Sequence, residues 1–305
     1  MKVTALAGGV GGAKLLSGLA TVLGDDLTAI VNTGDDHVVY GVHVSPDLDI
    51  VTYWLAGVAD TRRGWGLDGD SFEVIDALRR VGTDTWFSLG DRDFATCIRR
   101  TQRLGEGATL SDVTNELRRA YEVETAVLPM SDDPVSTHLE LADGRTLAFQ
   151  EYFVRERHEP EVSAVLLAGI EDAKPAPGVL DALIAAERVV LCPSNPFLSI
   201  APILALPGIR DALRSHPKVI AVSPIVGGVA LKGPADRLLH SLEKGRGAGA
   251  VARLYADFVD LFVIDADDPE ELSVAADAGV SAIALDTIMT GPDAAEVLAR
   301  ALLEL

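Results

Sequence analysis

The chain has 305 residues, of which 48% are apolar, and its formal net charge at pH 7 is −20. This composition predicts a globular protein and excludes a disordered chain. The negative field repels nucleic acid and anionic membranes, so neither is expected as a partner. No apolar run reaches transmembrane length, the first residues lack a signal-peptide pattern, and the two cysteines form no metal-binding spacing. We therefore predict a cytoplasmic protein with buried free thiols.

The first twenty residues predict a strand, a glycine-rich turn and a helix. Residues 3–7 form an apolar run, residues 8–14 read Gly-Gly-Val-Gly-Gly-Ala-Lys, and helical character begins at residue 15. Backbone amides in such a turn, together with a helix N-terminus, bind phosphate. The segment matches neither a P-loop nor a dinucleotide fingerprint. A turn that only packs the helix on a sheet is the alternative. The candidate phosphate-binding residues are Gly8, Gly9, Gly11, Gly12 and Lys14.

Continuous apolar runs that end in small or polar residues recur along the chain. They indicate strands buried on both faces, as in a parallel sheet, and helical patterns between them supply the crossovers. We predict an α/β fold, a Rossmann-like parallel sheet with helices on both faces. Because parallel strands end at one edge, where ligands bind, the loops 8–14, 32–36, 194–196 and 223–228 are expected to meet in one crevice. These loops add four candidate nucleotide-binding residues, Ser194, Asn195, Ser223 and Gly227.

The middle of the chain has a different pattern. Four helical segments follow one another over residues 45–121, and residues 123–169 are rich in strand patterns. Asp143-Gly144, between alternating runs, is a hairpin signal. We predict a nucleotide-binding core of residues 1–44 and 163–305. Residues 45–162 are predicted to be an inserted helical and hairpin region that covers the carboxyl edge of the sheet and binds the acceptor.

Asp47 and Asp49 lie at the start of a predicted helix, after Ser45 and Pro46. Ser45 suits an N-cap, Pro46 the first helical position, and Asp47 complements the helix dipole. Asp49 lies further in, where the capping explanation fades, so a functional carboxylate is expected there. We take both as candidate magnesium ligands. Replacing Asp49 by Asn is expected to lower turnover by about a hundredfold, with the thermal midpoint nearly unchanged.

Three further residues are candidates with structural alternatives. Asp91 suits a helix N-cap or a catalytic carboxylate. Arg92 follows it in the first helical turn, where a cation opposes the dipole, so it is either a surface residue or the partner of an anion. Asp132 is either an ordinary turn residue or a substrate contact.

The candidate residues include carboxylates, amides and cations but no nucleophile. The histidines have no metal-ligand spacing, and the chain lacks a Gly-x-Ser-x-Gly motif. Phosphoryl-type transfer needs little covalent chemistry from the protein. It needs magnesium on carboxylates and hydrogen-bond donors on phosphate oxygens.

The chain resembles the 2-phospho-L-lactate transferase family of deazaflavin coenzyme F-420 biosynthesis. The matching segments follow the family order over nearly the whole chain. Many members have a threonine and a proline in the glycine segment, where this chain has neither. The matching segments are the glycine start and residues 32–36, 45–49, 89–93, 129–137, 193–196 and 221–225.

The resemblance implies a magnesium-dependent transfer from a guanosine-diphosphate-linked three-carbon acid. The acceptor is Fo, 7,8-didemethyl-8-hydroxy-5-deazariboflavin, whose ribityl hydroxyl attacks the phosphorus distal to guanosine and releases GMP. The positions of Asp49 and Arg92 match the acceptor-binding positions of the family, and members are typically homodimers. The donor carries either a lactyl or an enolpyruvyl group.

Two other functions are alternatives for this sequence. One is a non-catalytic, nucleotide-sugar-binding regulatory protein of the related gluconeogenesis and morphogenesis factor group, which the segments 45–49 and 90–93 argue against. The other is an NAD-dependent dehydrogenase, which requires the glycine fingerprint that this chain lacks.

Overall fold

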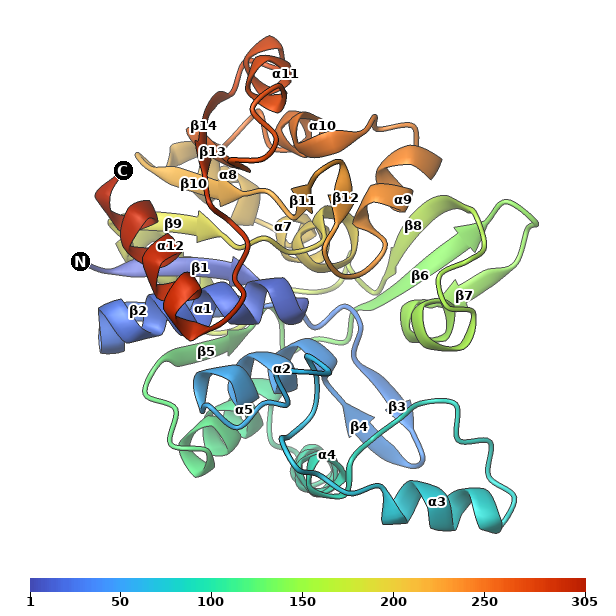
Figure 1. Ribbon diagram of the computed structural model, residues 1–305. Coiled ribbons are helices and arrows are strands. Elements are labelled where there is room, and N and C mark those ends of the chain that lie inside the picture. The colour runs from blue at the N-terminus through green and yellow to red at the C-terminus, as the bar shows by residue number, and fades with distance from the viewer.

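The computed structural model describes all 305 residues. Its centre is a seven-stranded parallel sheet, which runs through the upper half of the molecule in Figure 1. The predicted α/β fold is confirmed. From one edge to the other, the strands are β14 (Ser281–Leu285), β13 (Leu261–Asp265), β10 (Val219–Val222), β9 (Arg188–Leu191), β1 (Val3–Ala7), β2 (Leu27–Val31) and β5 (Ala126–Pro129).

The strand order creates a binding crevice at the middle of the sheet. From β1 the chain moves outward through β2 to β5, and it later returns to β9 on the other side of β1 and continues outward to β14. In a doubly wound sheet, the loops on the two sides of such a switch point leave in opposite directions. The ends of β1 and β9 therefore border a natural crevice.

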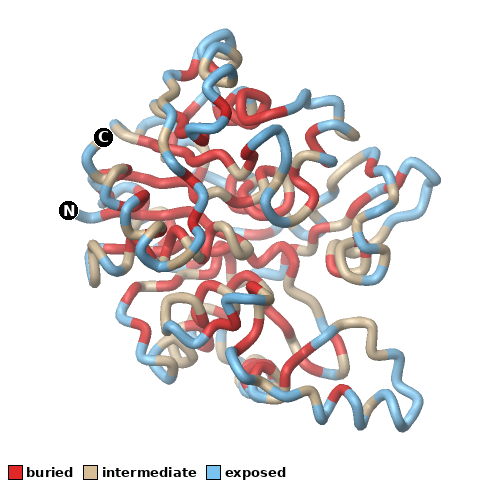
Figure 2. The backbone as a smooth tube through the Cα atoms, viewed as in Figure 1, coloured by how far each residue is buried: buried red, intermediate tan, exposed pale blue.

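Two hydrophobic clusters cover the two faces of the sheet. Successive side chains of β1 alternate between them, since Ala5 belongs to one cluster and Leu6 to the other. Figure 2 shows the buried residues concentrated along the sheet and beneath the helices that cover its faces. The helices of the first face are α1 (Gly9–Leu23), α2 (Pro46–Leu55) and α12 (Pro292–Glu304). Those of the second face are α6 (Val179–Ala185), α7 (Ala201–Ala205), α8 (Ile209–Ser215), α9 (Ala235–Ser241), α10 (Gly247–Leu254) and α11 (Glu271–Asp277).

The helices of the insertion lie below the sheet in Figure 1. They are α2, α3 (Glu73–Arg80), α4 (Asp91–Gly105) and α5 (Leu110–Ala120), beside the hairpin of β3 (His37–Val39) and β4 (Val42–Val44). A three-stranded antiparallel sheet projects to the right, and its strands are β7 (Thr146–Ala148), β6 (Ser136–Leu141) and β8 (Val162–Ala168). β6 and β7 flank Asp143-Gly144, so the predicted hairpin is confirmed.

The strands do not separate along the predicted domain boundaries. β5 lies within the predicted insertion but pairs with β2 in the main sheet. β8, most of which falls in the predicted core, pairs with β6 instead. Apolar patterns indicate that a strand exists but not which strand it pairs with, so the division at residues 44 and 162 stays a prediction.

No single helix is long and apolar enough to cross a membrane. The segments 196–205 and 209–215 reach the required length only when taken together, and they meet at an angle of 91°.

Candidate active site

A cavity of about 570 Å³ opens at the carboxyl edge of the sheet. The Gly8 amide donates to Ser194 Oγ at 3.1 Å, and the Ser194 hydroxyl lies 2.8 Å from the Gly8 carbonyl oxygen. The segment after β1 therefore meets the segment after β9, as the switch point requires. Ser223, after β10, also lines the cavity. The prediction that these loops converge is confirmed.

The glycine segment is a helix start and not a loop. Helix α1 begins at Gly9, so Gly9 to Lys14 form its first turns. The Gly9 amide donates to Asp47 Oδ1 at 2.6 Å, and a Cβ on Gly8 would lie 2.3 Å from Asp47 Oδ2. Glycine is required here because a carboxylate of α2 lies against the backbone. Gly12 is buried against Ser194 and Ala7 and does not line the cavity.

The other predicted nucleotide-binding residues fall into two groups. Lys14, Ser194, Asn195 and Ser223 line the cavity, whereas Gly227 is exposed outside it. Gly227 and its neighbour have φ angles of 61° and 76° and form the two-residue turn of the hairpin β11 (Ile225–Val226) and β12 (Val229–Ala230). Both φ angles are positive, which favours glycine there for a conformational reason. The Asn195 side chain caps the π-helical turn 196–200 and accepts two backbone hydrogen bonds.

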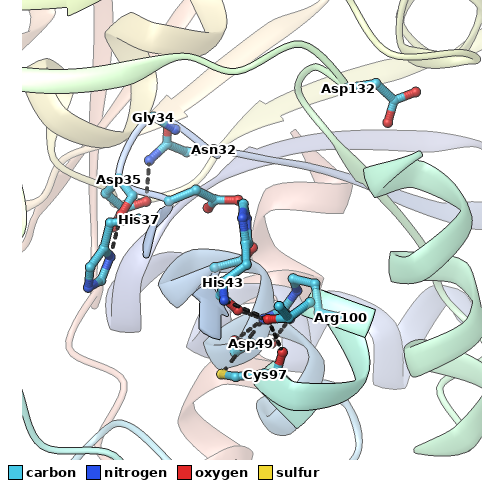
Figure 3. Close-up of polar contacts among 12 residues, drawn as sticks. Asn32, Gly34, Asp35, His37, His43, Asp49, Cys97, Arg100 and Asp132 are labelled. Carbon is cyan, nitrogen blue, oxygen red and sulfur yellow. Dashed lines mark hydrogen bonds and ion pairs between the residues drawn. The ribbon is translucent and has the colours of Figure 1, made fainter. Parts of the chain in front are cut away.

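A pair of buried carboxylates shares one amide beside the start of α1. Asn32 Nδ2 donates to Asp47 Oδ2 at 2.9 Å and lies 3.2 Å from Asp35 Oδ1, as Figure 3 shows for Asp35. Burial raises the pKa of Asp47 to about 6 and that of Asp35 well above its usual range, and the charge of Asp47 raises the latter further. Carboxylate oxygens are the ligands that Mg²⁺ prefers, and a cation relieves repulsion between them. The pair is a candidate magnesium site, in which the ion would replace amide donors of Gly9, Asn32 and Gln150.

Asp49 lies in a different cluster from Asp47. Both carboxylate oxygens of Asp49 face the guanidinium of Arg100, with Nη1 at 3.0 Å from Oδ2 and Nη2 bonded to Oδ1 (Figure 3). Both side chains are buried. Asp47 and Asp49 therefore face different neighbours, since Asp47 contacts the Gly9 amide and Asp49 contacts Arg100 of α4. Their assignment as magnesium ligands stays a prediction.

Asp93 and Cys97 adjoin this ion pair. Their ligand atoms and one oxygen of Asp49 all lie within 4.8 Å of one another. The Tyr53 hydroxyl donates to Asp93 Oδ1 at 2.8 Å. Burial, with a contribution from the Asp49 charge, raises the pKa of Asp93 to about 7. Asp93 also lines the cavity, so the carboxyl with this raised pKa faces the space where a ligand would bind.

Three further predicted site residues, besides Gly12 and Gly227, lie outside the cavity lining. Asp91 accepts hydrogen bonds from the Ser71 hydroxyl and from two backbone amides at the start of α3. Arg92, which is 57% exposed, contacts Asp70. Asp132 accepts from the Ser111 amide in the first turn of α5, and Figure 3 shows it apart from the Asp49 cluster. The carboxylates of Asp91 and Asp132 accept hydrogen bonds from backbone amides at helix starts, so each has a structural role. The catalytic role of Asp91 and the substrate contact of Asp132 stay predictions.

Several lining residues were not predicted. Asp93 stands beside Asp91 and Arg92, which were predicted instead, and Asp35 lies in the loop 32–36, which was expected at the crevice but for which no site residue was predicted. Phe149 and Phe153, with ring centroids 5.5 Å apart, form an apolar wall, and no motif marks them. Lys232 also lines the cavity and lacked a signal, since it is an isolated cation in its sequence. Arg100, the partner of Asp49, is one of several arginines of α4, and no motif distinguishes it from the others.

Comparisons with known proteins identify the family of the chain. The family model described as 2-phospho-L-lactate transferase CofD matches residues 3–303. A phosphoenolpyruvate transferase from Streptomyces griseus is 44% identical over 100% of this chain and 98% of its own length. A 2-phospho-L-lactate transferase from Methanosarcina mazei is 40% identical over 96% of each chain.

A solved structure shares the fold. The crystal structure of a member of the UPF0052 family from Bacillus halodurans aligns over 99% of each chain with a TM-score of 0.72, at 18% identity. At this identity the likeness concerns the fold alone. The sequence relatives, in contrast, cover the site and the core together, and the chain belongs to the 2-phospho-L-lactate transferase CofD family.

Proposed function

We propose that this transferase moves a phospholactyl or enolpyruvyl-phosphate group from a guanosine-diphosphate-linked donor to Fo, in coenzyme F-420 biosynthesis. The observation that carries the proposal is one cavity with two chemically different parts of its lining. Asp35, Asp47 and the start of α1 provide a polar part, and Phe149 and Phe153 provide an aromatic wall. A phosphoanhydride suits the polar part, and a planar deazaflavin suits the aromatic wall.

The polar part of the lining can bind the donor diphosphate. Helix α1 directs its first amides there, Lys14 adds a cation, and Ser194 and Asn195 come from the opposite side of the crevice. Asp35 and Asp47 would hold magnesium, which would neutralise charge on the phosphate oxygens. The negative electrostatic field of this acidic chain repels a diphosphate over the rest of the surface. Hydrogen-bond donors and cations in the cavity must therefore make the local potential favourable for it.

The transfer is a displacement at the phosphorus distal to guanosine. The ribityl hydroxyl oxygen forms a bond to this phosphorus, the bridging P–O bond breaks, and GMP leaves with the bridging oxygen. The hydroxyl proton must pass to a base. Asp93 lines the cavity with a pKa of about 7, which suits a general base at neutral pH. Asp49 binds and orients Arg100, whose charge acts on Asp93.

The test is to incubate the protein with Fo, magnesium and each of the two donors, and to identify the products by mass. The expected products are GMP and Fo carrying the three-carbon phosphodiester. Asp47→Asn keeps an acceptor for the Gly9 amide but removes a magnesium ligand, and we expect it to abolish most of the product. A bound sugar nucleotide with no affinity for Fo, and no product with either donor, would contradict the proposal and favour the non-catalytic regulatory group.

A further inference from the structure

Two lysines from distant segments line the same cavity without a carboxylate partner. Lys14 Nζ donates to the Met289 carbonyl oxygen at 2.8 Å, and Lys232 Nζ donates to the Arg63 carbonyl oxygen at 3.0 Å. Neither lysine forms an ion pair, although acidic residues outnumber basic ones by 46 to 26 in this chain. An ammonium has three donors, so each lysine keeps donors for a further acceptor.

The charge of Lys232 acts on Lys14 across the cavity that both residues line. The pKa of Lys14 is lowered by partial burial and, in addition, by the charge of Lys232. Two like charges that face one cavity destabilise each other unless an anion lies between them. An anion bound between the two lysines would offset this repulsion.

The loop of Arg63 and Gly64 holds Lys232 in position. Lys232 follows the β11–β12 hairpin, and its Nζ is held by the loop around Arg63. A Cβ on Gly64 would lie 2.9 Å from Lys232 Nζ and 3.3 Å from Val10 Cγ1. Val10 is one helical turn before Lys14. The loop of the insertion thus packs against both the start of α1 and the lysine of the hairpin.

We propose that Lys14 and Lys232 form an anion subsite for the distal phosphate of a nucleoside diphosphate. The assignment rests on the proposed function for the identity of the ligand, but the subsite itself stands on the two lysines and the cavity that they line. A phosphate has enough oxygens to accept hydrogen bonds from both ammonium groups at once. In the free protein, each ammonium donates instead to a separate carbonyl oxygen. Lys232 is a binding residue that comes from the hairpin side of the cavity.

The test measures binding of GDP, GMP and inorganic pyrophosphate by calorimetry to the wild type and to Lys14→Met and Lys232→Met. Each variant removes one charge and keeps an apolar stem. We expect GDP and pyrophosphate to bind at least about tenfold more weakly, and GMP to change by less than about twofold. Lys232→Arg should restore most of the GDP affinity. The control is Lys244→Met, which removes the same charge at an exposed position outside the cavity and should leave all three affinities unchanged.

The outcomes separate this proposal from the proposed function. Unchanged GDP and pyrophosphate affinities in both variants, or an equal loss for GMP, would overturn the subsite even if the transfer reaction is observed. If the wild type binds pyrophosphate but not GDP, and both variants lose pyrophosphate, the subsite is supported and the guanosine donor is wrong. Thermal midpoints of the variants identify any loss of binding that arises from unfolding.

Discussion

The ion pair between Asp49 and Arg100 changes what a substitution at Asp49 is expected to do. From the sequence, Asp49→Asn was expected to affect turnover and not stability. Arg100 is 2% exposed and would keep a buried charge without its partner, which typically costs about 3–5 kcal/mol. We predict a clear fall in the thermal midpoint, measured by calorimetry. Asp49→Asn combined with Arg100→Met should recover most of it, and an unchanged midpoint in the single variant would contradict the ion-pair argument.

Asp93 makes stability depend on pH. Its pKa is raised to about 7 in the folded state, against about 4 in the unfolded chain. The folded state therefore binds the proton more tightly, and the free energy of unfolding falls as pH rises from about 4 to 7. Asp93→Asn keeps an acceptor for Tyr53 and removes the titration. We predict that urea unfolding finds the variant more stable than the wild type at pH 8, by on the order of 2 kcal/mol, with the difference vanishing near pH 4. Equal pH profiles would exclude this contribution.

At the scale of elements, the start of α3 depends on a carboxylate from α4. Asp91 accepts from the Glu73 amide at 3.1 Å and from the Val74 amide at 3.0 Å, so it caps a helix to which it does not belong. We predict that Asp91→Ala lowers the free energy of unfolding by about 1 kcal/mol, as for loss of an N-cap, and changes turnover by less than about twofold. Chemical unfolding and steady-state kinetics together test this. A hundredfold loss of turnover would instead support the catalytic role expected from the sequence.

At the scale of the whole molecule, the net charge of −20 destabilises the compact state by self-repulsion. Salt screens charges that lie more than about 10 Å apart at 0.1 M ionic strength, so this repulsion weakens as salt is added. We predict that the thermal midpoint rises between about 0.02 and 0.5 M KCl, an interval over which the screening length becomes shorter than the separation of most surface charges. A midpoint that falls over this interval would mean that attractive ion pairs outweigh the excess of carboxylates.

The sequence by itself determined the strands and helices of the core. Continuous apolar runs such as residues 218–222 are typical of strands buried on both faces, and the structure has β10 there. The convergence of the segments after β1, β9 and β10 also followed from the sequence, because all strands of a parallel sheet end at one edge. Strand neighbours did not follow, since β5 and β8 have similar local patterns and join different sheets.

The partners of the polar side chains were decided only by the tertiary structure. Asp47 and Asp49 are two residues apart, yet α2 directs Asp47 to the Gly9 amide and Asp49 to Arg100 of α4. Residues two apart on a helix point in different directions, and the neighbours that they meet come from segments distant in the chain. The same holds for Lys14 and Lys232, which are separated by most of the sequence and brought to one cavity by the fold. Local sequence determines which residues begin a helix or strand, but contacts between distant segments determine which charge each carboxylate or lysine meets.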